Sequence, residues 1–249
     1  MIGTLAAAAL CAAAGCQTPA PAALPAGSRA PVAQGMPDAG SPADAARALL
    51  ASARERRLRI AREELQASAD PAALAGEASA CAAEAHRSWA AQFPEAAADA
   101  HPLQRLGPGA AEALYLEAVC TALGARMQGF TPLIERRVEL TEVLLRVAQL
   151  APDLDGAGAE RELGALYAAL PAHAGGDLDL ARKHLLAALE RAPQDARNHL
   201  VLARTVAVKA QDRALFREQL ELAAKSADGA SAAQAQALLR REDELFAPE

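Results

Sequence analysis

The chain has 249 residues, which is enough for one large domain or two modest ones. Aromatic residues make up only 3% of it and β-branched residues are scarce, whereas a β-sheet would need more of both, so we expect an all-α fold. The formal net charge of −6 excludes the strongly basic surface that nucleic-acid binding requires, and no nucleic-acid partner is expected.

The first residues of the chain are typical of a targeting segment. Leu5 to Gly15 form an apolar run that is too short to cross a bilayer as a helix, and its small residues end directly before Cys16. Such a run is typical of a secretory signal peptide, and a cysteine at this place resembles a bacterial lipobox. We therefore predict that residues 1–16 are a signal peptide with an acylated Cys16; an ordinary leader with an incidental cysteine is the alternative.

Residues 17–40 are predicted to be a flexible tether, because an Ala/Pro-rich stretch with five prolines cannot bury a core. Residues 41–249 are predicted to form a single all-helical domain. A lipid on Cys16 would hold this domain at a membrane without a transmembrane helix. The expected location is the periplasm, and Gln17 after the cysteine slightly favours the outer over the inner membrane.

Nine helical segments are expected in this domain, with short polar turns between them. Asp70 and Asp177 are predicted N-caps, and prolines mark several starts and stops. The expected helices are residues 42–67, 70–92, 109–127, 131–150, 157–170, 177–191, 195–209, 212–225 and 230–246. Such short connections predict antiparallel neighbours, each burying one apolar stripe against the next.

The most specific pattern lies in residues 164–193. Its members are Gly164, Tyr167, Leu170, Pro171, Gly175, Gly176, Asp177, Ala181, Leu185, Ala188 and Pro193. Three of them, Ala181, Leu185 and Ala188, lie four and three apart on one helix face, and a proline ends the helix. This spacing is that of tetratricopeptide repeats, in which small residues let two helices cross closely. Weaker copies at 140–147 and 216–223 predict an α-solenoid array of degenerate repeats, with a generic antiparallel bundle as the alternative.

Two cysteines of the body, Cys81 and Cys120, lie on neighbouring predicted helices. In an oxidising periplasm a single disulfide between them and a pair of small buried thiols are both open alternatives. Neither cysteine has a second ligand at metal-binding spacing, so we expect no metal site.

No motif in the chain points to catalysis. There is no Gly-x-Ser-x-Gly, the five histidines lack zinc-binding spacing, and no phosphate-loop lysine follows Gly175–Gly176–Asp177. Carboxylates such as Asp153, Asp155 and Glu242 are interpreted as solvated groups on helix ends. We therefore expect neither an enzyme nor a cofactor.

Residues from about 102 to 246 resemble the T component of tripartite ATP-independent periplasmic (TRAP) transporters, a family of periplasmic tetratricopeptide-repeat lipoproteins. The resemblance rests mainly on the Leu170–Pro171 turn, the Gly175–Gly176–Asp177 helix start and Ala181–Arg182. It implies a non-catalytic accessory protein that binds the transporter's solute-binding protein, forms homo-oligomers and passes a small hydrophobic ligand.

A second function stays open beside this one: an envelope scaffold lipoprotein that organises other proteins without a small-molecule ligand. A closed, apolar-lined channel would favour the transporter component, whereas an open groove rimmed by arginine would favour the scaffold.

Overall fold

The computed structural model describes residues 41–64 and 69–246. Every regular element in these ranges is a helix, which confirms the all-α fold class. The predicted signal peptide, Cys16 and the tether lie outside the described residues, as do residues 65–67 at the end of the first expected helix. Among the described helices none is both long and apolar enough to cross a membrane.

Twelve α-helices follow one another along the described part of the chain, with three short irregular helices between them. The α-helices are α1 (Pro42–Glu63), α2 (Pro71–Gln92), α3 (Pro94–Ala97), α4 (Pro102–Arg105), α5 (Ala111–Gln128), α6 (Phe130–Leu150), α7 (Gly158–Ala169), α8 (Leu178–Arg191), α9 (Ala196–Leu202), α10 (Arg213–Ala224), α11 (Gly229–Arg240) and α12 (Glu242–Leu245). The others are the 3₁₀ turns η1 (Pro108–Ala110) and η2 (Ala172–Ala174) and the π-helical η3 (Ala203–Ala207).

Polar side chains cap the starts of most long helices. Ser41 and Asp44 form a reciprocal capping box at α1. Aspartates accept a hydrogen bond from a backbone N–H in the first turn of five further helices, α2, α8, α9, α10 and α11. The predicted caps Asp70 and Asp177 are among them. These local contacts fix the starts that the sequence predicts, because each satisfies an N–H that has no partner within its helix.

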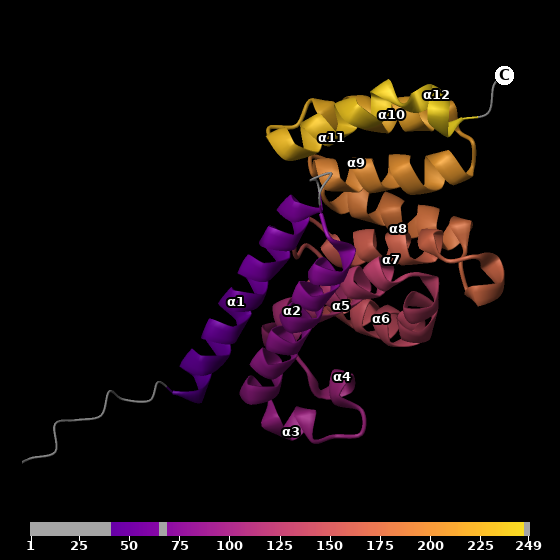
Figure 1. The fold of residues 1–249 in the computed structure, drawn as a ribbon. Coiled ribbons are helices and arrows are strands. Elements are labelled where there is room, and N and C mark those ends of the chain that lie inside the picture. Colours follow the sequence, from indigo (N-terminus) through magenta and orange to yellow (C-terminus); the bar gives the residue numbers. More distant parts are fainter. Residues whose placement is uncertain (1–40, 65–68, 247–249) are drawn as a thin grey trace, which may run out of the picture. The chain divides into compact units, whose positions relative to one another are not determined.

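Helices that are consecutive in the chain pack together, with α2 meeting α5 across the short α3 and α4. Figure 1 shows α9, α10 and α11 following α7 and α8 in chain order. Helix α5 is the most enclosed, since α1, α2 and α6 all contact it and it buries residues on every side. Packing in chain order is what an α-solenoid shows; the assignment as tetratricopeptide repeats stays a prediction.

The close crossing predicted for residues 164–193 is formed by α7 and α8. Ala181, Leu185 and Ala188 are all fully buried on one face of α8. A Cβ atom added to Gly164 of α7 would lie 2.5 Å from Cγ of Leu185 and 3.0 Å from the carbonyl oxygen of Ala181. The two helices therefore touch at a point where only glycine leaves enough room.

The prediction of a single helix over residues 230–246 is wrong, because the chain turns at Arg241 and forms α11 and α12. The turn brings Phe246 against Phe216 of α10, with ring centroids 5.1 Å apart. It also buries Glu242, whose carboxylate accepts a hydrogen bond from Arg217. These tertiary contacts outweigh the local preference of this alanine-rich stretch for one continuous helix.

Two other segments differ from expectation in detail. The break expected between residues 93 and 108 contains the one-turn helices α3 and α4. The helix expected over 195–209 is interrupted by the π-helical turn η3, which contains Arg204. Such π turns occur frequently at functional sites.

Candidate functional site

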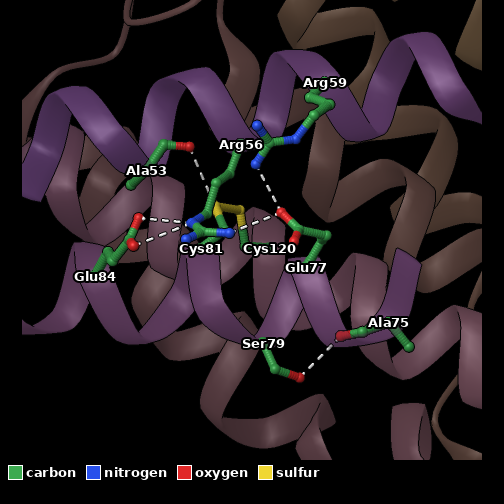
Figure 2. The surroundings of a disulfide bond; sticks show 9 residues. All are labelled: Ala53, Arg56, Arg59, Ala75, Glu77, Ser79, Cys81, Glu84 and Cys120. Atoms are coloured by element: carbon green, nitrogen blue, oxygen red, sulfur yellow. Dashed lines mark hydrogen bonds and ion pairs between the residues drawn. A yellow bond between two sulfur atoms is a disulfide. The ribbon is translucent and has the colours of Figure 1, made fainter. Parts of the chain in front are cut away.

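A disulfide joins Cys81 of α2 to Cys120 of α5, so the two helices are cross-linked in the structure. Figure 2 shows the side chain of Arg56 from α1 beside the disulfide, between two glutamates of α2. Arg56 donates to Glu84 at 3.0 Å and to Glu77 at 2.7 Å. Hydrogen bonds from Arg59 and Arg56 lower the pKa of Glu77. The disulfide and this ion-pair cluster together hold α1, α2 and α5 as one unit.

A second polar cluster surrounds Asp155 in the connection between α6 and α7. Its carboxylate accepts hydrogen bonds from the guanidinium groups of Arg161 at 2.8 Å, Arg197 at 2.7 Å and Arg57 at 3.1 Å. It also accepts one from the Tyr115 hydroxyl at 2.6 Å. These four partners come from α7, α9, α1 and α5. The interpretation of Asp155 as a solvated carboxylate is therefore wrong.

The charges around Asp155 outweigh its partial burial. Burial alone would raise the pKa of this carboxyl, but the positive charges of Arg57 and Arg161 and the hydrogen bond from Tyr115 hold it well below its usual range. Arg161 is itself almost fully buried. At neutral pH the carboxylate is thus an anion that neutralises buried guanidinium groups, and we assign it a structural role.

A hollow of about 740 Å³ opens among α1, α5, α6, α7 and η3. Part of its wall is apolar and includes Ala61, Val119, Leu123, Phe130, Leu133, Ala165, Ala168 and Ala169. Four basic residues also line it, namely Arg57, Arg126, Arg204 and Lys209, against only two acidic ones, Glu64 and Glu162. The hollow thus combines an apolar surface with an excess of positive charge.

Arg204 differs from the other basic residues of this hollow in its contacts. Its guanidinium makes no hydrogen bond or ion pair with any residue that the structure describes, although it stays accessible through the hollow. Desolvation lowers its pKa, and the positive charge of Arg126 lowers it further. An arginine stays protonated at neutral pH even so. Glu162 and Glu64 partly offset its charge, but the guanidinium keeps its hydrogen-bond donors available to whatever enters the hollow.

The other basic groups of the hollow are at least partly engaged. Arg57 bonds to Asp155, and Nζ of Lys209 donates to the carbonyl oxygen of Ala168. Arg126 lies 3.9 Å from the Glu162 carboxylate, which is a loose ion pair. An anion beside Arg204 would thus meet a second guanidinium that is only weakly held.

The predicted motif residues lie beside this hollow and do not line it. Gly175 has φ of 88°, and a Cβ on Gly176 would lie 1.9 Å from the carbonyl oxygen of Leu170, so this turn admits glycine only. The N–H of Asp177 donates to the Tyr167 carbonyl oxygen, which ties the turn back to α7. The motif therefore shapes the α7–α8 pair, while the hollow is built from other residues.

Two histidines of the described chain pair with glutamates. Nδ1 of His86 lies 2.9 Å from Glu117 in a polar groove of about 560 Å³ along α2, α5 and α6. His184 meets Glu160 at 2.7 Å and stacks on Tyr167. No group of three or more His, Cys, Asp or Glu side chains within the described residues could hold a metal ion.

Sequence reasoning missed the hollow, because its lining comes from five elements that are far apart in the chain. One signal was available: lysine is rare here, and Lys209 follows Arg204 after five residues on a predicted helix. The hollow is neither the closed, apolar-lined channel expected of a transporter component nor simply the open, arginine-rimmed groove expected of a scaffold. It is open and edged by arginine, yet part of its wall is apolar.

The comparison with protein families found one match. The family model described as TRAP transporter T-component matches residues 72–246, which is well over half of the chain. The match begins in α2, so it extends the resemblance upstream of residue 102 and leaves α1 outside it. No curated protein sequence matched the chain.

Proposed function

Because the chain belongs to the TRAP transporter T-component family, we propose that it is a non-catalytic accessory that binds the solute-binding protein of such a transporter. In this proposal the body of residues 41–249 makes the contact, and the lipid predicted on Cys16 holds it at a membrane facing the periplasm. The family is one of transporter components, which supports an accessory role.

The proposal includes a small ligand, and the hollow is the observation that carries it. A volume of about 740 Å³ lies in the range of small-molecule sites, which combine apolar walls with a few polar anchors. Arg204 supplies, at η3, a guanidinium that has no hydrogen bond or ion pair with a described residue, and α5 and α7 supply an apolar wall. The ligand that suits both is a small molecule with an anionic head and an apolar body, rather than a purely hydrophobic one.

Two fluorescent probes test this ligand class on the full chain: dansylaminoundecanoate, which is an anion with an apolar tail, and its neutral methyl ester. We expect the acid to bind at least tenfold more tightly than the ester, because a charge-assisted hydrogen bond contributes about 1.5–3 kcal/mol. Arg204→Gln should weaken the acid by a similar factor and leave the ester unchanged.

Arg182→Gln is the matched control, since Arg182 is an exposed arginine of α8 that does not line the hollow. Equal binding of acid and ester, or no effect of Arg204→Gln, would show that the hollow is no anion site. Absence of all probe binding would remove the ligand from the proposal, and the association with the solute-binding protein would then be judged on its own titration.

The scaffold function remains the second candidate, because the hollow is open and edged by arginine. In that case the hollow would take an acidic segment of another envelope protein. Direct titration with a glutamate-rich decapeptide distinguishes the two. If the chain binds neither probe, and the peptide binds to wild type but not to Arg204→Gln, the scaffold is favoured.

A further inference from the structure

The outer face of α6 carries a stripe of exposed apolar side chains. Phe130 and Val138 have 66% and 55% of their surface exposed, and Ile134 and Leu145 are also exposed. The spacing of four, four and seven residues puts all four on one side of the helix, over about 22 Å at 1.5 Å per residue. The other large exposed apolar residues of the described chain are scattered over α1, α8 and α10. We call these four residues the α6 stripe.

One edge of the α6 stripe is acidic. Glu135, Glu139 and Glu142 follow it around the helix at about 100° per residue, and all three are exposed. Glu139 pairs with Arg136, whereas Glu135 and Glu142 have no hydrogen bond or ion pair with any described residue. Free carboxylates beside an apolar stripe favour a partner that has basic residues around an apolar patch.

The opposite edge of the stripe is already occupied. Arg137 lies against Gly175 of the motif turn, because a Cβ on that glycine would come within 2.2 Å of Nη1 of the arginine. On this edge a partner would meet Arg137 and the motif turn, whereas the acidic edge is exposed.

The charges also argue against a second copy of this chain as the occupant. A two-fold axis that pairs two α6 helices in antiparallel fashion sets the same edge of each helix against the other. With the axis near the middle of the stripe, Glu135 of one copy would then face Glu142 of the other, and like charges placed so closely are destabilising.

The α6 stripe is continuous with the hollow at its first residue. Phe130 belongs to the stripe and, with Leu133, also lines the hollow. A protein bound along the stripe would thus sit at the mouth of the hollow, where a ligand could pass between the two.

We propose that the α6 stripe is the surface on which the solute-binding protein docks, through an apolar patch edged by lysine or arginine. This inference rests on the proposed function and deepens it, since it says where the partner binds and what chemistry its surface has.

Isothermal titration of the full chain with the purified solute-binding protein of the same transporter tests the inference. Ile134→Ser with Val138→Ser removes two stripe residues that do not line the hollow, and should weaken binding at least tenfold. Glu142→Lys should weaken binding and reduce its dependence on salt. Leu186→Ser removes an equally exposed leucine of α8 and should change nothing.

The outcomes distinguish failure of the docking surface from failure of the proposed association with the solute-binding protein. If wild type and all variants bind alike, the docking surface is wrong while the association stands. If wild type does not bind, both fail. If the stripe variants dissociate an oligomer of the chain itself, seen by its mass in solution, the stripe is an interface between copies and the inference is overturned. Thermal melts of the exposed-site variants establish that they remain folded.

Discussion

The crossing of α7 and α8 predicts opposite effects for one and the same substitution at two helical glycines. Gly164 lies inside α7 and Gly76 inside α2, so replacing either by alanine gains about 1 kcal/mol of helix propensity. At Gly76 a Cβ would meet nothing within 4 Å. Gly76→Ala should therefore raise the free energy of unfolding by about 1 kcal/mol.

At Gly164 the same methyl group has no room. It would lie 2.5 Å from a fully buried leucine, Leu185, and 3.0 Å from the backbone oxygen of Ala181, which cannot move without moving α8. Overpacking of this kind costs about 1–3 kcal/mol. Because the propensity gain is common to both variants, Gly164→Ala should be less stable than Gly76→Ala by that same amount.

Urea unfolding followed by circular dichroism measures the difference, and thermal melts should show a gap of about 2–4 °C for each kcal/mol in a domain of this size. The two variants share the substitution, so their comparison removes effects on the unfolded chain. If Gly164→Ala and Gly76→Ala shift the urea midpoint equally, the close crossing of α7 and α8 is refuted.

Three further predictions concern the covalent and charged contacts. Replacing Cys81 and Cys120 together by alanine should cost about 4 kcal/mol, because the disulfide closes a loop with a sequence separation of 39; an unchanged urea midpoint would contradict this. Asp155→Asn should cost about 3 kcal/mol at pH 7, a figure discounted because the carboxylate is 21% exposed. Since folding lowers the pKa of Asp155, the ionised carboxylate stabilises the fold above about pH 4. The difference in unfolding free energy between wild type and Asp155→Asn should therefore shrink as the pH falls below about 4. A difference that grows there would refute the lowered pKa. Metabolic labelling with a fatty acid should mark wild type but not Cys16→Ser, and equal labelling of both would remove the lipoprotein prediction.

Local patterns predicted the helical elements well, because their signals lie within a few residues. A cap such as Asp177 fixes a helix start through one backbone contact, and a proline blocks the next turn. The α8 face was predictable for the same reason, since Ala181, Leu185 and Ala188 lie on it at helical spacing and are all buried.

The polar sites depended on contacts that no local pattern contains. Asp155 looks like an ordinary loop carboxylate until Arg57, which is 98 residues earlier in the chain, reaches it from α1. Arg204 looks like an ordinary exposed residue of a helix, and only the packing of α1, α5, α6 and α7 around it makes it part of the hollow beside Arg126. Likewise, helical spacing predicted the apolar face of Leu140, Leu144 and Val147, which is buried, but it did not show that the α6 stripe stays exposed.

Titration calorimetry of the full chain against the solute-binding protein decides whether this T-component family member acts as proposed. We predict saturable, reversible binding that is unchanged in Cys16→Ser, because the helical body makes the contact and the lipid does not. Absence of binding heat, together with separate elution of the two proteins in gel filtration, would contradict the proposed association. Turnover of a substrate that a single side-chain substitution abolishes would contradict the non-catalytic role as well.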